Sequence, residues 1–174
     1  MYVSCERVFQ PRLCGRPVVV LSSNDGACIA RSNEAKDLGV KMAQPWFQVR
    51  HLERSAGLLA VSANFELYGD MSNRMMAVVA RFAPRQEVYS IDESFLDLSG
   101  MSMRAESLAA YGVEIRQRVA DWLGLAVCVG IAPTKTLAKL ANHCAKKGLA
   151  GADGVCDFTT LNSGALSHLF ARIE

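Results

Sequence analysis

The sequence predicts an α+β protein in which helices back a small sheet. Two long stretches, 65–82 and 105–123, carry apolar residues at helical spacing. Between them, two short apolar segments flank a tight connection within EVYSIDESFLDL, and the apolar segment LAVCVGIA follows the second stretch. This order of helix, two strands, helix and strand is typical of a split β-α-β sheet, with one strand missing at the front.

The N-terminal part of the sequence begins with the short amphipathic segment MYVSCERVF, and its pattern predicts a small mixed α/β lobe at residues 11–63. RPVVVLSS predicts a buried strand that an Asn-Asp-Gly turn closes, and ACIARS is its expected hairpin partner. NEAKDLGVK predicts a short helix that ends at Gly39, and Pro45 opens a further segment, PWFQVRHL.

The rest of the chain predicts three helices around the apolar strands. Pro84 ends the first, whose expected buried stripe is Leu67, Met71, Met75, Val78, Val79 and Phe82. The second has an apolar face of Leu108, Tyr111, Ile115, Val119 and Trp122. Pro133 and Thr134 start the third, and after a Gly-rich linker the tail predicts a partial amphipathic helix.

Composition excludes several classes of protein. The 174 residues are 51% hydrophobic, which suffices for a core, while a net charge of +2 indicates nucleic-acid binding only if basic residues cluster locally. No segment reaches the roughly 18 apolar residues of a membrane span, and no signal peptide is evident, so we expect a cytoplasmic protein. The six cysteines form no C-x-x-C pair and are expected to be buried reduced thiols, and the three histidines suggest no metal site.

Asp92 and Glu93 are adjacent carboxylates at the connection between the two apolar segments. In a strand they would point to opposite faces, whereas at a turn they can converge. Converging carboxylates can chelate Mg²⁺, a hard cation that prefers oxygen ligands. A solvated turn is the alternative, because acidic residues are common there.

Basic residues gather on the helix PTKTLAKLANHCAKK at 133–147. Lys135, Lys139 and Lys146 fall near one face, and no acidic residue occurs between Asp121 and Asp153. Such a lysine ridge suits contacts with the phosphates of a nucleic acid or a triphosphate, although an ordinary solvated helix face fits equally.

Arg31 and Lys36 flank the end of the first hairpin and the short helix that follows. They could add phosphate contacts, although surface ion pairs explain them as well. Tyr2, Phe9 and Tyr68 are expected to be core aromatics on this evidence.

Taken in order, YVSCE, VVVLSSNDG, IARSNEAKDLGVKM, NFELYGDMSNRMM, EVYSIDESFLDLSG and VCVGIAPTKTLAKLANHCAKK resemble the Y-family DNA polymerases, and among them most closely the UmuC and RulB type. The resemblance covers roughly residues 1 to 171. YSIDESFLDL and GIAPTKTLAKLANHCAK together are highly specific motifs of that family.

The resemblance implies a role for each matching residue. Asp92 matches the carboxylate that two Mg²⁺ ions share, and Glu93 one that helps bind the ion activating the primer 3′-hydroxyl. Tyr2 matches the steric-gate tyrosine under the sugar. Lys36 lies where the family has a basic residue near the incoming triphosphate, and Lys146 matches a lysine that neutralises its phosphates.

The resemblance also implies a domain layout and a reaction. Residues 11–63 would be the fingers, 64–153 most of a ferredoxin-like palm, 154–174 the start of the thumb, and 1–10 a remnant of the first palm segment. The reaction would be two-metal nucleotidyl transfer from a deoxynucleoside triphosphate to a primer on damaged template DNA. The implied context is translesion synthesis and DNA repair in the SOS response, with a UmuD-type accessory protein and other repair proteins as further partners.

Two departures from the family pattern lower the expected activity. A third metal-binding aspartate lies five positions before the tyrosine that Tyr2 matches, and this chain begins one residue before that tyrosine. The rest of the thumb and the little-finger domain do not follow Glu174. We therefore expect an incomplete two-metal site, a palm sheet without its first strand, and an exposed sheet edge that makes solubility marginal.

The sequence is compatible with three functions. The first is the fingers and palm of an error-prone DNA polymerase, with weak activity or none in this chain alone. The second is a non-catalytic remnant that binds DNA or partner proteins through the lysine ridge. The third, a ferredoxin-like interaction module, predicts binding of neither metal nor nucleotide.

Overall fold

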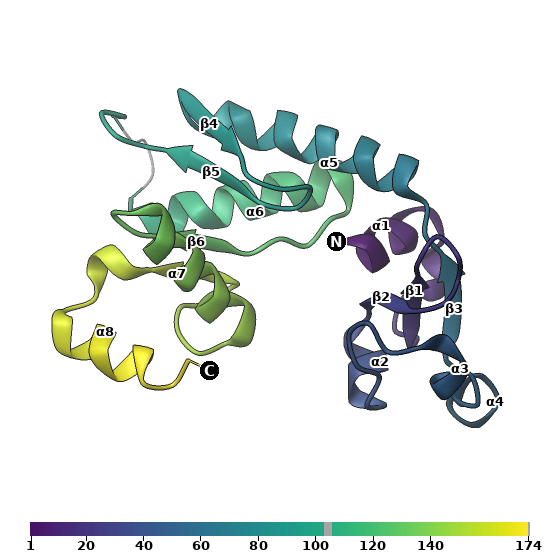
Figure 1. Cartoon of the computed structure of the whole chain (residues 1–174). Helices are drawn as coiled ribbons and strands as arrows, with labels where there is room; N and C mark the ends of the chain where they lie inside the picture. The colour runs from purple at the N-terminus through teal and green to yellow at the C-terminus, as the bar shows by residue number, and fades with distance from the viewer. Residues whose placement is uncertain (103–105, 174) are drawn as a thin grey trace. The chain divides into compact units, whose positions relative to one another are not determined.

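The chain divides into two compact units, Met1–Asn73 and Arg74–Glu174. Figure 1 shows them in a computed structural model, which describes residues 1–102 and 106–173. Within these ranges, no helix has both the length and the apolar character that a membrane crossing requires.

The first unit is built around a three-stranded sheet of order β2-β1-β3. β1 (Val18–Leu21) runs antiparallel to β2 (Cys28–Arg31), which confirms the predicted hairpin, and parallel to β3 (Leu59–Ser62), which the sequence analysis did not identify. The helices of this unit are α1 (Tyr2–Phe9), η1 (Pro11–Leu13), α2 (Asn33–Asp37), α3 (Trp46–Val49), α4 (Leu52–Ala56) and the start of α5 (Phe65–Val79).

All four residues of β1 are buried, because α1 and a second layer of short helices cover the sheet. Val19 and Leu21 contribute to a core that also contains Cys28, Val40, Val49 and Leu58. Ser32 caps α2 by accepting a hydrogen bond from the Ala35 amide, and Gly39 follows the helix with a φ of +83°, as the sequence predicts for its end.

The interior of the first unit also holds a polar pair. The Tyr68 hydroxyl on α5 donates to the Glu6 carboxylate on α1 at 2.7 Å, and Gln10 donates to the same carboxylate. Tyr68 is fully buried, as expected, whereas Phe9 is 59% exposed and is therefore not the core residue that the sequence analysis expected.

The second unit contains two small sheets instead of one. β4 (Arg85–Val88) pairs antiparallel with β5 (Ser94–Asp97), and β6 (Val129–Ile131) pairs parallel with β7 (Val155–Asp157), a strand that the sequence analysis missed. Its helices are the end of α5, η2 (Ala80–Phe82), α6 (Leu108–Leu123), α7 (Lys135–Lys147), η3 (Phe158–Thr160) and α8 (Ser163–Phe170). The mixed α/β class with helices behind small sheets is as predicted.

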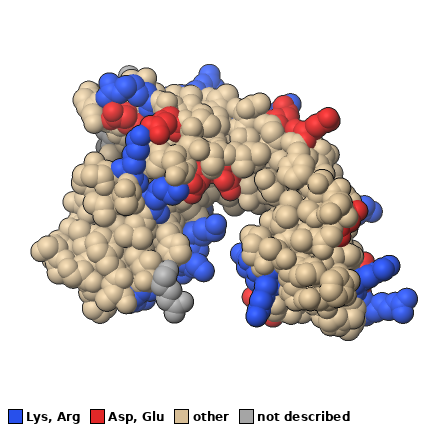
Figure 2. All heavy atoms as spheres, viewed as in Figure 1, with Lys and Arg blue, Asp and Glu red and all other residues tan. Residues whose placement is uncertain are grey.

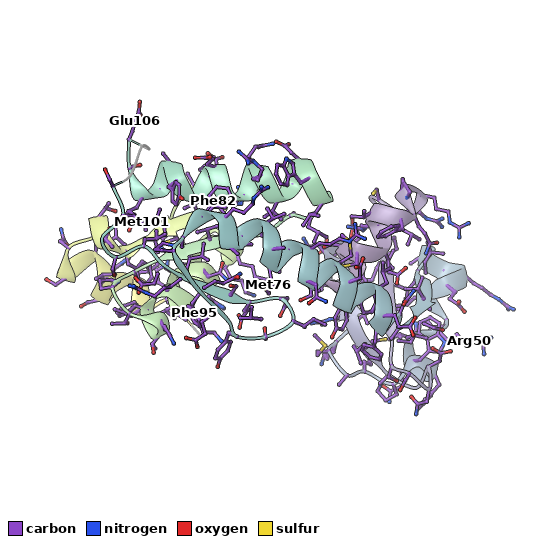
Figure 3. The ribbon with its side chains drawn as sticks, turned by 90° about the horizontal axis from the view of Figure 1, so that it is seen from above. Arg50, Met76, Phe82, Phe95, Met101 and Glu106 are labelled. Carbon is purple, nitrogen blue, oxygen red and sulfur yellow. The ribbon has the colours of Figure 1, made fainter. Side chains whose placement is uncertain are left out.

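Helices α5 and α6 are joined through aromatic residues. Met76 and Phe82 lie along α5 and its η2 extension in Figure 3, and the Tyr111 hydroxyl of α6 donates to the Phe82 carbonyl at 2.7 Å. Trp122, expected on the buried face of α6, is 52% exposed, and the Arg81 and Arg118 guanidinium groups lie over its ring. α6 begins at Leu108 with Ser107 as its cap, and Ala105, its predicted start, lies outside the described residues.

A glycine allows α7 to pack directly on β6. A Cβ atom at Gly130 would lie 2.1 Å from the Asn142 amide nitrogen and 2.2 Å from the Ala138 carbonyl oxygen. Because no side chain larger than a hydrogen atom fits there, only glycine at this position lets the helix pack this close to the strand. Thr134 caps α7 as predicted, by accepting a hydrogen bond from the Leu137 amide.

The six cysteines are all free thiols, and four of them are buried. Burial raises the pKa of the Cys156 thiol to about 11, which keeps it protonated. Cys14 is exposed and Cys128 is partly exposed, so the expectation of buried thiols fails at these two positions. Both lie outside strands and helices, where no packed core covers them.

Candidate functional site

Asp92 and Glu93 lie in the connection that joins β4 to β5. The Tyr89 and Ser90 amides both donate to the Glu93 carbonyl, at 3.0 and 3.1 Å, so the chain folds back on itself at this point. The Ser90 hydroxyl also donates to the Asp92 carboxylate at 3.1 Å. The turn geometry that the sequence predicts is therefore present, and it presents both carboxylates at the end of one hairpin.

The two carboxylates have different partners. Asp92 is exposed and accepts a hydrogen bond from the uncharged Ser90 hydroxyl. Glu93, by contrast, forms an ion pair of 3.0 Å with Lys139 of α7. The Lys139 ammonium also lies 4.2 Å from the centroid of the Tyr89 ring. The pKa of Lys139 is raised, chiefly by its hydrogen bond with Glu93, so this ammonium stays charged.

One turn earlier on α7, Lys135 makes the same kind of contact. Its ammonium pairs with the Glu87 carboxylate of β4 and lies 5.6 Å from the centroid of the Phe95 ring of β5. Figure 2 shows acidic and basic side chains close together over the surface of the second unit. Two members of the predicted lysine ridge are thus paired with the hairpin, while Lys146 is exposed at the end of α7.

A cavity of about 770 Å³ opens beside this hairpin, within the second unit. Asp92, Glu93, Lys135 and Lys139 all line it, together with β5, β6 and the apolar sides of α5 and α6. Among the described residues, the buried Oδ1 atom of Asn142, which also lines the cavity, has no hydrogen-bond partner. Charged groups of both signs therefore border one apolar-walled hollow, an arrangement typical of ligand sites.

The pair suits a hard cation. Carboxylate oxygens are preferred ligands of Mg²⁺, which commonly uses one or two of them and completes its shell with water and substrate phosphates. Within the described ranges, no group of three or more His, Cys, Asp or Glu side chains is arranged to hold a metal ion. Asp92 and Glu93 fit such a cation only if other ligands come from solvent or substrate.

Tyr2, Arg31 and Lys36 belong to the first unit, whereas the carboxylate pair belongs to the second. The Tyr2 ring stacks on Tyr68 with centroids 4.4 Å apart and meets Phe65 edge to face. Arg31 donates to the Val40 carbonyl at 2.7 Å, and its Nε atom is buried.

Lys36 is exposed on α2 and donates to Asn33 at 2.9 Å. Its ammonium is therefore at the surface of the first unit, where an anion can reach it. Arg31, by contrast, has part of its guanidinium group committed to the backbone of its own unit.

Sequence reasoning did not single out Glu87, Tyr89 or Ser90, which complete the surroundings of the carboxylate pair. A signal was available, because Glu87 and Tyr89 are two residues apart and would share one face of an extended chain, while Lys135 and Lys139 are one helical turn apart. That two such spacings face each other depends on packing between distant segments.

The chain matches a known protein family over most of its length. The impB/mucB/samB family model matches residues 1–143. The chain is 52% identical to Protein UmuC of Salmonella typhimurium over 161 residues, which are 92% of this chain and 38% of that protein. The chain thus spans well under half the length of this relative.

Two solved structures share the fold. The insertion ternary complex of Dbh DNA polymerase matches with a TM-score of 0.75 and 28% identity, over 96% of this chain and 47% of the other. A Y-family DNA polymerase chimera matches with a TM-score of 0.73 and 30% identity, over 91% of this chain and 46% of the other.

Proposed function

Since the chain belongs to the impB/mucB/samB family, as its motifs predict, we propose that it is the fingers and palm part of an error-prone Y-family DNA polymerase. The observation that carries this proposal is the Asp92–Glu93 pair at the end of the β4–β5 hairpin, beside a cavity that α7 lysines also line. We assign residues 11–63 to the fingers, 64–153 to the palm, 154–174 to the start of the thumb and 1–10 to the first palm segment.

Asp92 and Glu93 would bind Mg²⁺, and they are the residues to which we assign catalysis. When bound, Mg²⁺ would lower the barrier to attack by a primer hydroxyl on the α-phosphate, by stabilising negative charge on the attacking and leaving oxygens. Lys146 would neutralise the phosphates, Lys36 would approach them from the fingers, and Tyr2 would lie under the sugar. These roles agree with the exposure of both lysines.

Arg31, Lys135 and Lys139 are weaker candidates for phosphate contacts. Arg31 already donates to a backbone carbonyl, and the two α7 lysines are paired with Glu87 and Glu93. Each would have to give up a present partner before it could bind a phosphate.

The biological role that we propose is translesion synthesis on damaged primer-template DNA during the SOS response, with a UmuD-type protein as a partner. Family membership and the 52% identity to Protein UmuC support it. The chain spans 38% of that relative, and in the part that the structure describes no group of three or more His, Cys, Asp or Glu side chains is arranged to hold a metal ion. We therefore expect it to extend primers weakly or not at all by itself.

Calorimetry tests the proposed site directly. A deoxynucleoside triphosphate is titrated into the chain with and without Mg²⁺, and into an Asp92→Ala/Glu93→Ala variant. We expect Mg²⁺-dependent binding that disappears in this variant, because the carboxylates link cation and nucleotide.

The control is Glu114→Ala/Asp121→Ala, which removes the same charge from exposed positions of α6. It should bind like the unmodified chain. Equal binding by the Asp92→Ala/Glu93→Ala variant would show that the nucleotide uses another site. No binding by the unmodified chain would reject the proposed function for this chain.

A further inference from the structure

The Glu93 carboxylate is not free in the structure, and its partner is held in place from two sides. Lys139 lies 3.0 Å from a Glu93 oxygen and 4.2 Å from the centroid of the Tyr89 ring. The Tyr89 amide donates to the Glu93 carbonyl, so the hairpin turn itself sets the ring beside the carboxylate. An ammonium fits between them because ring faces and carboxylates both attract cations.

Adjacent carboxylates repel each other, and a positive charge nearby reduces this repulsion. Asp92 has the Ser90 hydroxyl, which carries no charge, so Lys139 is the cation that the structure places against the pair. The two side chains of the ion pair remain 42% and 40% exposed, and exposed ion pairs are weak. A divalent cation from solvent can therefore compete with Lys139 for Glu93.

We propose that Lys139 is a built-in counter-ion of Glu93, which the carboxylate exchanges for a divalent cation when the cation binds to the Asp92–Glu93 pair. The exchange would move the Lys139 ammonium off Glu93 at the moment a metal-bound nucleotide arrives, which frees it for the incoming phosphates. Lys139 would then act as a positioning residue that sets the affinity of the site for metal. This inference rests on the function proposed above.

Lys135 supplies a matched comparison within the same helix. It too makes an ion pair and a ring contact with the hairpin, but with Glu87 and Phe95 instead of the carboxylate pair. Loss of either lysine removes one positive charge and one tie between α7 and the hairpin. Only Lys139 should alter metal binding through Glu93.

The test measures binding of Mn²⁺ alone, without nucleotide, from the electron paramagnetic resonance signal of the free ion. The variants are Lys139→Gln, Lys135→Gln, Lys139→Arg and Glu93→Gln, each checked for folding by circular dichroism. We expect Lys139→Gln to bind Mn²⁺ about three- to tenfold more tightly than the unmodified chain, because competition and repulsion by the ammonium are both removed. Lys135→Gln and Lys139→Arg should change the affinity by less than about twofold.

A Glu93→Gln/Lys139→Gln variant completes the cycle. If Lys139 acts through Glu93, the gain from Lys139→Gln disappears when Glu93 is already neutral. An equal gain in both backgrounds, or an equal gain from Lys135→Gln, would overturn the inference in favour of a general charge effect. No change in Lys139→Gln would overturn it while leaving the metal site intact, and no Mn²⁺ binding by any variant would overturn the proposed function as well.

Discussion

The Tyr68 hydroxyl donates a 2.7 Å hydrogen bond to the Glu6 carboxylate inside the first unit, where Tyr68 is fully buried and Glu6 is 5% exposed. This bond joins α5 to α1, two helices that lie far apart in the sequence. Because a buried carboxylate is costly without hydrogen bonds, the contact is expected to stabilise the unit.

The first prediction concerns that bond. Tyr68→Phe should lower the free energy of unfolding by about 1 to 3 kcal/mol, since it leaves Glu6 with fewer donors while keeping the ring. Urea unfolding followed by circular dichroism measures the change. Tyr2→Phe, which removes a hydroxyl from the ring stacked on Tyr68, is the control and should cost less than about 0.5 kcal/mol. Equal losses in the two variants would contradict the role given to Glu6.

The second prediction concerns the packing of α7 on β6. Gly130→Ala should destabilise the second unit by roughly 1 to 3 kcal/mol or more, because the new methyl group meets backbone atoms of the helix. Thermal unfolding measures it. Gly69→Ala on α5 is the control, since no atom apart from the adjoining backbone of its own helix lies within 4 Å of its Cβ position.

The control should stabilise the protein by about 0.5 to 1 kcal/mol, the gain expected from alanine in a helix. A neutral Gly130→Ala would show that α7 can move away from the strand at little cost. The same variant should also disturb the ion pairs of Lys135 and Lys139, because both residues are on α7.

The third prediction is a pH dependence. The Asp97 carboxylate accepts hydrogen bonds from Ser99 and Arg85, and these hold its pKa well below the usual range. A carboxyl whose pKa is lower in the folded state contributes stability at pH values above its unfolded pKa of about 4, and this stability is lost as the pH falls. When the pH is lowered from about 6 to about 3, the Tm of Asp97→Asn should therefore fall by less than the Tm of the unmodified chain.

Thermal unfolding at several pH values measures this effect. Asp121→Asn, an equal change in charge on the exposed side of α6, is the control. An acid dependence that remains the same in Asp97→Asn would show that other groups cause it.

The fourth prediction separates the lysines of α7 by their DNA binding. Lys146 is exposed, whereas Lys135 is paired with Glu87. Of these two lysines, we therefore expect only Lys146 to neutralise a DNA phosphate, and so to displace a counterion, without first breaking an ion pair. Lys146→Gln should lower the slope of log affinity against log salt by about 1 for a duplex of fixed length. Lys135→Gln should lower it by less than about half of that.

Fluorescence anisotropy at four salt concentrations measures both slopes. Equal reductions would mean that the Glu87 ion pair opens on DNA, and that the lysine ridge acts as the sequence alone suggested. If neither slope changes, DNA binding does not use Lys135 or Lys146.

Local sequence signals predicted most of the elements. The cap at Thr134, the glycine at the end of α2 and the apolar stripe of α5 are encoded within a few residues, so they could be recognised without the structure. The motifs around Asp92 and α7 likewise indicated the family. Strands β3 and β7 were missed because each pairs in parallel with a strand far away in the sequence, and short strands carry little signal of their own.

The sequence by itself determined where the helices and hairpins form, and that two carboxylates meet at a turn. Only the tertiary structure decided which charges those carboxylates face. Lys139 reaches Glu93, and Lys135 reaches Glu87, because Gly130 lets α7 lie directly on β6 beside the hairpin. The direction in which a helix face points depends on packing between distant segments, and helical spacing alone carries no information about it.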